Sequence, residues 1–174
     1  MKDKISVLIS EEDLKKRIAE MGEEISRDYA GKEIHMISVL RGGVFITTGL
    51  ANCISVPVTI DFMSVSSYGN SISTSGNVLI KKDLEDDIAG KDVLVVEDII
   101  DSGVTLSKLI PLLKQRNPAS LRICTLLDKP ERREAEIQVD YIGFQVPNKF
   151  VVGYGLDYQQ RYRNLPYIGE VHCD

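Results

Sequence analysis

The chain has little cysteine and histidine, few aromatic residues and no tryptophan. Its three cysteines, Cys53, Cys124 and Cys173, are an odd and widely scattered set without metal-ligand spacing. We therefore expect no disulfide framework, and a reducing, cytoplasmic setting. The two histidines, His35 and His172, lie too far apart in the sequence to propose as a pair. We interpret each of them as structural or solvated rather than catalytic.

Long hydrophobic runs are also missing. Met1-Lys2-Asp3-Lys4 is charged and only a short apolar stretch precedes Ser10, which is too little for a signal peptide or a membrane span. Basic residues are in the minority, with a net charge of −5 and a pI near 5.1, which argues against nucleic acid or an anionic membrane as the main partner. No repeat or Pro/Gly/Ser tract divides the 174 residues, so we expect a single domain, 1–174.

The sequence does contain a series of short segments rich in β-branched, aliphatic and aromatic residues, with helical stretches between several of them. This alternation predicts an α/β fold with a doubly wound, mainly parallel sheet flanked by helices. The predicted strands are 34–40, 56–63, 93–96, 121–127 and 141–144.

Two helices are predicted from apolar spacing. The first follows Ser10, has a plausible stop at Gly31, and has one face formed by Leu14, Ile18, Met21 and Ile25. The second covers roughly 103–116, where Pro111 should remove a hydrogen bond and kink the helix. Its buried residues are predicted to be Leu106, Leu109, Ile110 and Leu113.

The most informative segment is 93–106, where an apolar strand meets Glu97 and Asp98 and then the turn Asp101-Ser102-Gly103-Val104-Thr105. The turn offers successive backbone N–H groups at a helix start, two hydroxyls and a glycine, which together suit a phosphate. The two acids would repel a phosphate but suit sugar hydroxyls or Mg²⁺. The pattern therefore predicts a sugar phosphate site at the carboxyl end of a strand. The alternative is an ordinary helix capped by Ser102, with solvated acids.

This segment resembles the PRPP-binding signature of the type I phosphoribosyltransferases. The resemblance implies that Asp101 to Thr105 bind the 5′-phosphate of PRPP, and that Glu97 and Asp98 hold the ribose hydroxyls and Mg²⁺. It also implies that Asp101 is the catalytic general base, which accepts the N7 proton of a purine.

The segment 64–82 is dense in small polar residues and lacks an apolar face, so we expect it to be mobile. It is either a surface hairpin loop or a lid that closes over the reactants and excludes water. The family resemblance favours the lid, because the purine-using members have Ser-Tyr where this chain has Ser67 and Tyr68.

A second turn, Leu40-Arg41-Gly42-Gly43, ends the first predicted strand. Its glycines allow close approach of the backbone, and Arg41 supplies a forked donor, so Arg41 and Gly42 suit a pyrophosphate. The alternative is a tight strand-to-helix turn with a surface arginine. The resemblance implies a non-proline cis peptide bond between Leu40 and Arg41, although many purine-specific relatives have lysine at this position.

Two segments of the last third, 126–130 and 150–158, resemble the base-binding elements of the hypoxanthine-guanine phosphoribosyltransferases. The second of them is predicted to form a strand that ends in the carboxylate of Asp157. The resemblance implies that Lys129 donates to the purine 6-oxygen, that Phe150 stacks on the ring, and that the Val151 backbone meets its Watson–Crick edge. Without it, Lys129 and the charged residues that follow would be interpreted as a solvated run, and Phe150 as a core aromatic.

Three further assignments complete the implied site. Ile99 and Asp157 belong to the purine site, and Asp157 is also a third Mg²⁺ ligand. Arg163 reaches the pyrophosphate, with Arg161 as a near competitor. A small hood over the base would be formed by the N-terminal and C-terminal segments.

The resulting hypothesis is a purine salvage enzyme that transfers the 5-phosphoribosyl group from PRPP to hypoxanthine or guanine with Mg²⁺, giving IMP or GMP and pyrophosphate. The resembling enzymes are generally dimers or tetramers, so we expect a homodimer or homotetramer without nucleic-acid or membrane partners. Two alternatives remain. One is a transferase for another base, of which xanthine is the hardest to exclude, and the other is a PRPP- or nucleotide-sensing regulator on the same fold.

Overall fold

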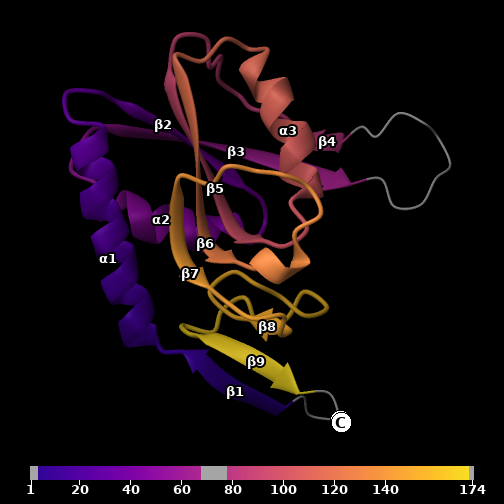
Figure 1. Cartoon of the computed structure of the whole chain (residues 1–174). Coiled ribbons are helices and arrows are strands. Elements are labelled where there is room, and N and C mark those ends of the chain that lie inside the picture. Colours follow the sequence, from indigo (N-terminus) through magenta and orange to yellow (C-terminus); the bar gives the residue numbers. More distant parts are fainter. Residues whose placement is uncertain (1–3, 68–77, 173–174) are drawn as a thin grey trace, which may run out of the picture.

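The centre of the protein, in a computed structural model that describes residues 4–67 and 78–172, is a six-stranded sheet (Figure 1). Its order is β4-β3-β2-β5-β6-β7, and β4 alone runs antiparallel to its neighbour. The strands are β2 (Ile34–Val39), β3 (Val58–Ser67), β4 (Val78–Lys82), β5 (Asp92–Ile100), β6 (Ser120–Asp128) and β7 (Tyr141–Gln145). The prediction of a mainly parallel α/β sheet is confirmed.

Both faces of this sheet are covered, as the near-continuous apolar runs predicted. On β5, Leu94 and Val96 pack with helices α1 (Glu11–Asp28) and α2 (Gly43–Ala51), while Val93 and Val95 pack with α3 (Val104–Lys114). Successive side chains of a strand point to opposite faces, so the two core clusters lie on opposite sides of the sheet. This is the doubly wound arrangement.

The first predicted helix is confirmed as α1. The Ser10 hydroxyl caps it by accepting a hydrogen bond from the N–H of Asp13 at 3.1 Å, and the predicted apolar face is buried. In α3 the predicted buried leucines are buried as well, whereas Ile110 is only half-buried, and the helix continues through Pro111 to Lys114. None of the described helices is both long and apolar enough to span a membrane. Cys53 and Cys124 are free thiols, and Cys173 lies outside the described residues.

Two strands of the central sheet extend beyond their predicted ends. Strand β5 continues to Ile100, so Glu97 and Asp98 lie within the strand and not in the loop after it. Strand β3 continues to Ser67 and pairs with β4 through Ser64 to Ser67, so the predicted loop 64–82 contains two paired strands at its ends. Residues 68–77, including Tyr68, lie outside the described residues.

A second, three-stranded sheet has the order β1-β9-β8. It brings β1 (Lys4–Ile9) against β9 (Ile168–His172), with β8 (Val151–Val152) on the other side. Figure 1 shows this sheet below the ends of β6 and β7, in the segments to which the sequence assigned the hood. The strand predicted to run from Val151 to Asp157 ends at Val152, because positive φ angles at Gly153, Tyr154 and Gly155 turn the chain.

A buried hydroxyl ties α1 to the sheet. The hydroxyl of Tyr141 donates to Asp28 Oδ2 at 2.6 Å and accepts from Arg122 Nη1 at 2.7 Å, and the tyrosine is only 3% exposed. We expect Tyr141→Phe to lower the free energy of unfolding by about 1 kcal/mol, the net contribution of a typical hydrogen bond.

Urea denaturation of parent and variant measures this difference. Tyr167→Phe is the control, because the Tyr167 hydroxyl makes no hydrogen bond within the described residues. Equal midpoints for Tyr141→Phe and the parent would show that the hydroxyl adds nothing.

Candidate active site

The turns that follow β2 and β5 meet at the carboxyl edge of the central sheet. They border a pocket of about 260 Å³ whose lining includes Leu40, Val65, Glu97, Asp101 and Thr105. The pocket lies on the sheet face covered by α3, since Val39, Val65 and Leu106 around it belong to that core cluster. Ligands of open α/β sheets bind beyond the carboxyl ends of the strands, as this pocket would allow.

The turn from Asp101 to Thr105 has unpaired backbone donors. Within the described residues, the N–H groups of Ser102, Gly103 and Thr105 donate no hydrogen bond to protein. The N–H of Val104 is engaged only by Ser102 Oγ, at 3.3 Å. The N-cap position of α3 is Gly103, with φ of 78°, and not Ser102 as the alternative interpretation had it. This row of free amides at a helix start can hold an anion.

The segment after β6 holds this turn in place through hydrogen bonds. Ser102 O accepts hydrogen bonds from the N–H groups of Glu134, at 2.9 Å, and Ala135, at 3.1 Å. The Arg133 guanidinium pairs with the buried carboxylate of Asp128 and donates to Asp101 O at 3.4 Å. The charged run at 131–134, which is a solvated surface on composition alone, therefore holds the anion-binding turn in place. Sequence reasoning missed this role.

Glu97 and Asp98 point to opposite faces of the sheet. Glu97 lines the pocket, whereas the Asp98 carboxylate lies against Gly42 at the start of α2. Burial, and then the charge of Asp98, raise the pKa of Glu97 well above its usual value. Burial also raises the pKa of Asp98 to about 6, against the lowering effect of the Ile99 N–H and Arg163. Such groups favour a cation, which would stabilise their ionised forms.

The turn after β2 brings its backbone close to Asp98. A Cβ at Gly42 would lie 1.7 Å from Asp98 Oδ2 and 3.1 Å from the carbonyl oxygen of Gly155, so only glycine fits. The Leu40–Arg41 peptide bond is cis, as the resemblance implied. Arg41 is exposed, and its Nη1 donates to Gln160 Oε1 at 2.9 Å.

Gln160 joins the two arginines that were assigned to the pyrophosphate. Its Oε1 also accepts from Arg163 Nη2 at 3.0 Å, and its N–H donates to Asp157 Oδ2 at 2.8 Å. Arg163 further pairs with Asp157 Oδ1 at 3.2 Å. Arg163 thus lies beside Arg41, while Arg161 is exposed to solvent. No sequence signal pointed to Gln160, because a glutamine in a polar loop resembles any surface residue.

Lys129 is the most unusual cation of this edge. It follows β6 and is only 7% exposed, yet within the described residues its ammonium group makes no hydrogen bond or ion pair. Burial lowers its pKa, although the charge of Asp101 raises it in part. Its backbone N–H donates to Ile100 O at 2.9 Å, which fixes it beside the end of β5. An ammonium group without a protein partner at this edge is available to a ligand acceptor.

The aromatic group assigned to the base directly precedes β8 of the second sheet. Phe150 is 50% exposed and meets Tyr158 edge to face, with ring centroids 5.3 Å apart. It is therefore not a core aromatic. Val151 is buried in β8, and Ile99 packs against the core on the α1 side of the sheet. An exposed apolar ring is available for stacking on a ligand.

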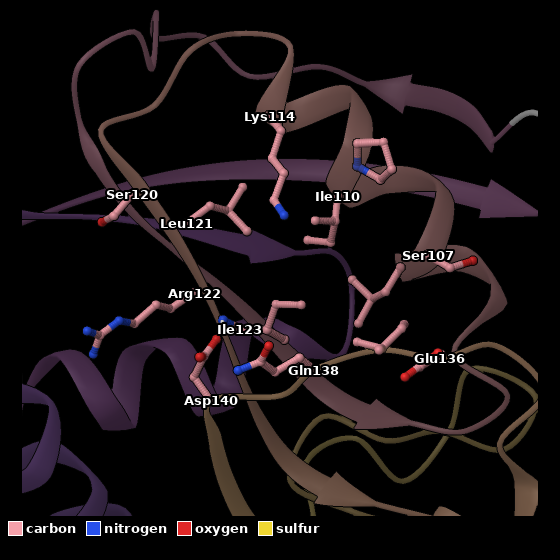
Figure 2. Close-up of a pocket in the computed structure, with 13 residues that line it drawn as sticks. Ser107, Ile110, Lys114, Ser120, Leu121, Arg122, Ile123, Glu136, Gln138 and Asp140 are labelled. Carbon is pink, nitrogen blue, oxygen red and sulfur yellow. Dashed lines mark hydrogen bonds between the residues drawn. The ribbon is translucent and has the colours of Figure 1, made fainter.

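A larger hollow of about 480 Å³ lies elsewhere, between α3, β6 and residues 136–140 (Figure 2). Its floor is aliphatic, with Ile110, Leu121 and Ile123 packed on the core. Asp140, one of its acids, is already used by the N–H of Ile123 at 2.8 Å. It lies away from the free N–H groups of the turn after β5 and from the acids of β5, so we place the active site at the smaller pocket.

Gly103 offers a direct test of the anion-binding turn. Its φ of 78° is unfavourable for other residues, and a Cβ there would lie 3.0 Å from Arg133 Cδ and 3.2 Å from Ala135 O. We expect Gly103→Ala to destabilise the fold by about 1–2 kcal/mol, the usual cost of a left-handed conformation, and to weaken binding of PRPP.

Thermal unfolding and a PRPP binding titration measure the two effects. Gly31→Ala is the control, because Gly31 has a similar φ of 77° but nothing within 4 Å of an added Cβ. It should lose stability without losing affinity. Undiminished affinity in Gly103→Ala would contradict the assignment of this turn.

Comparison with known proteins agrees with this geometry. Residues 9–159 match the family model of the phosphoribosyl transferase domain. The chain is 53% identical, over 98% of its length and 97% of the relative, to a hypoxanthine phosphoribosyltransferase of Salmonella typhimurium. It is 55% identical, over 94% of its length and 84% of the relative, to a hypoxanthine-guanine phosphoribosyltransferase of Mycobacterium tuberculosis. A crystal structure of a hypoxanthine-guanine phosphoribosyltransferase from Bacillus anthracis superimposes with a TM-score of 0.93, at 48% identity, covering 98% of this chain and 100% of that one.

Proposed function

This chain belongs to the phosphoribosyltransferase family, and we propose that it transfers the 5-phosphoribosyl group of PRPP to hypoxanthine or guanine, giving IMP or GMP and pyrophosphate. The observation that carries this proposal is the turn after β5, whose free N–H groups at Ser102, Gly103 and Thr105 border the pocket. In our assignment this turn binds the 5′-phosphate, and the ribose lies between it and Glu97.

Leaving-group stabilisation falls to the turn after β2 and the loop around Gln160. Arg41 and Arg163 are held beside each other by Gln160 Oε1, at 2.9 and 3.0 Å. As the bond to pyrophosphate loosens, negative charge grows on the departing oxygens, and two guanidinium groups placed in advance stabilise that charge. Gly42 in this turn leaves room for the Asp98 carboxylate, so a cation held by Asp98 would lie beside a pyrophosphate bound at this turn.

The acids fit a divalent cation. Glu97 and Asp98 both have raised pKa values, which a neighbouring cation would lower, and carboxylate oxygens are the ligands that Mg²⁺ prefers. In our proposal Asp98 holds Mg²⁺ with help from Asp157, whose oxygens now serve Arg163 and Gln160. Glu97 points to the other face of the sheet, and the oxygens of the three acids do not lie within 4.8 Å of one another, so the expected three-carboxylate site is not formed and Glu97 is assigned to the ribose hydroxyls. The ion would neutralise the pyrophosphate oxygens when PRPP is bound.

The base would lie between the second sheet and the end of β6. Phe150 offers its exposed ring, and Lys129 offers an unpaired ammonium to a purine 6-oxygen. A donor at this position selects an oxo group over an amino group, because adenine would set a donor against a cation. Residues 64–82 are proposed to close over the reactants, and the second sheet is proposed to be the hood. We further propose a cytoplasmic homodimer or homotetramer.

A product assay tests the function. Purified protein is incubated with PRPP, Mg²⁺ and each of hypoxanthine, guanine, xanthine, adenine and uracil separately, and the nucleotide formed is identified. We expect IMP and GMP. Formation of the xanthine nucleotide alone would favour the alternative base, and the absence of any nucleotide would favour a binding protein on the same fold.

A further inference from the structure

A cluster of metal-ligand side chains lies far from the proposed active site. His35 begins β2 and Asp61 lies in the first half of β3, on the same sheet face as the pocket but toward the amino end of the strands. Asp86, in the connection from β4 to β5, covers them. The ligand atoms of these three residues all lie within 4.8 Å of one another, and no other group of three in the described chain does so.

One atom of this cluster has no partner. His35 is 2% exposed, and its Nδ1 is bonded to Thr59 Oγ1 at 2.7 Å. Its Nε2 is buried without a hydrogen-bond partner among the described residues. An unsatisfied buried polar atom is costly and points to an absent ligand. A histidine that ligates a metal through one nitrogen commonly donates its other ring N–H to an oxygen, and Thr59 Oγ1 is placed to accept it.

The protonation states also suit a cation. Burial, and then the charge of Lys91, lower the pKa of His35, which keeps the Nε2 lone pair free at neutral pH. Burial alone would raise the pKa of Asp61, but N–H groups of Asp86, Phe62 and Glu85 lower it overall, so the carboxylate stays ionised.

The residues around the cluster hold the Asp61 carboxylate in place. Asp61 is 4% exposed and is fixed by backbone N–H groups: Oδ1 accepts from Phe62 at 2.7 Å, and Oδ2 accepts from Glu85 at 2.8 Å and Asp86 at 3.0 Å. Oδ1 therefore keeps lone-pair capacity. The nearby Lys82 is paired with Glu85 at 3.3 Å, so it does not occupy the carboxylates of the cluster.

We propose that His35 Nε2, Asp61 and Asp86 bind a divalent transition-metal ion, with Zn²⁺ as the best-suited candidate. One neutral imidazole and two carboxylates balance its charge, and the exposed Asp86 leaves room for water as a fourth ligand. The imidazole favours Zn²⁺ over Mg²⁺, which prefers oxygen ligands alone. The ion would fasten the connection 83–91 to the first two parallel strands and would take no part in phosphoribosyl transfer.

Equilibrium dialysis against Zn²⁺ tests the site, with bound metal counted by mass spectrometry. The informative variant is Asp86→Asn, because this side chain is exposed and its loss leaves the core intact. Its matched control is Glu85→Gln, which removes a neighbouring exposed carboxylate outside the cluster. We expect the parent and Glu85→Gln to bind one more Zn²⁺ than Asp86→Asn, or to bind it about 10-fold more tightly or better, since even outer partners of a metal contribute that much.

Thermal unfolding gives a second readout that does not depend on activity. Zn²⁺ should raise the Tm of the parent and of Glu85→Gln, and raise that of Asp86→Asn less. Anomalous diffraction at the zinc edge from soaked crystals should place a peak among His35, Asp61 and Asp86. Equal Zn²⁺ stoichiometry and affinity in all three proteins, with peaks only at the active-site acids or at Cys173, would overturn the proposal while leaving the transferase function untouched.

Discussion

Replacing Asp101 with asparagine is expected to lower kcat by about 10²- to 10⁴-fold while the fold is preserved, the range typical of a lost general base. Asp101 borders the pocket, its side chain is 46% exposed, and Arg132 Nε lies 3.2 Å from its Oδ1. It can therefore reach a ligand in the pocket without breaking a core contact. As the new bond to the sugar forms, the proton of the purine N7 needs an acceptor, and asparagine cannot take it.

The split between kinetic constants distinguishes this role from mere support of the turn. Asparagine keeps the backbone N–H and the shape of Asp101, so the KM for PRPP should change little while kcat falls. Glu134→Gln is the matched control, an exposed carboxylate on the adjoining segment, and should turn over like the parent. Turnover of Asp101→Asn within about tenfold of the parent would remove Asp101 from the proton transfer.

Lys129→Met should cost the enzyme its preference for 6-oxopurines. Methionine keeps an unbranched stem but removes the ammonium, and a hydrogen bond to a charged donor contributes about 1.5–3 kcal/mol. The kcat/KM for hypoxanthine should therefore fall about 10- to 100-fold, whereas that for adenine should not fall. Steady-state assays with both bases measure the ratio, and an unchanged ratio would mean that another group recognises the 6-position.

The same variant should be at least as stable as the parent. The Lys129 side chain has no hydrogen-bond or ion-pair partner within the described residues, and burial lowers its pKa, so its charge destabilises the free protein. This destabilisation is fully present below the folded-state pKa and disappears as the pH rises to the ordinary lysine value, where both states lose the proton. The stability advantage of Lys129→Met should therefore be largest near neutral pH and shrink in alkaline buffer. Urea midpoints at several pH values measure it.

Elements buried on both faces were predictable, because they have to be apolar throughout. Strand β5 is the clearest example, since Val93 to Val96 are all buried. This apolar run was enough to predict the strand, the turn after it and the helix that follows. The exact end of the strand was not visible, since Glu97 and Asp98 are as compatible with a loop as with a strand. Had the end been known, the alternation of side chains would have predicted that the two acids face opposite sides.

Contacts between segments that lie far apart in the sequence could not be predicted from the sequence pattern. Gln160, which joins Arg41 to Arg163, and Arg133, which pairs with Asp128 beneath the anion-binding turn, are polar residues in irregular segments. The residues around them in the sequence do not indicate which distant residues they contact. The short strands β1 and β9 went unpredicted because a few residues of moderate hydrophobicity have no recognisable period, and β8 was predicted too long because the turn after Val152 was not recognised.

The pairing of β1 with β9 delays the completion of the second sheet while the chain is being synthesised. Lys4 lies opposite His172, so β1 waits for β9, which is synthesised roughly ten to thirty seconds later at ordinary elongation rates. During that interval β1 has an open edge, and Val7, 61% exposed even in the finished fold, offers an apolar contact to other nascent chains. The central sheet can assemble in the meantime. The second sheet is then completed only after every strand of the central sheet has been synthesised.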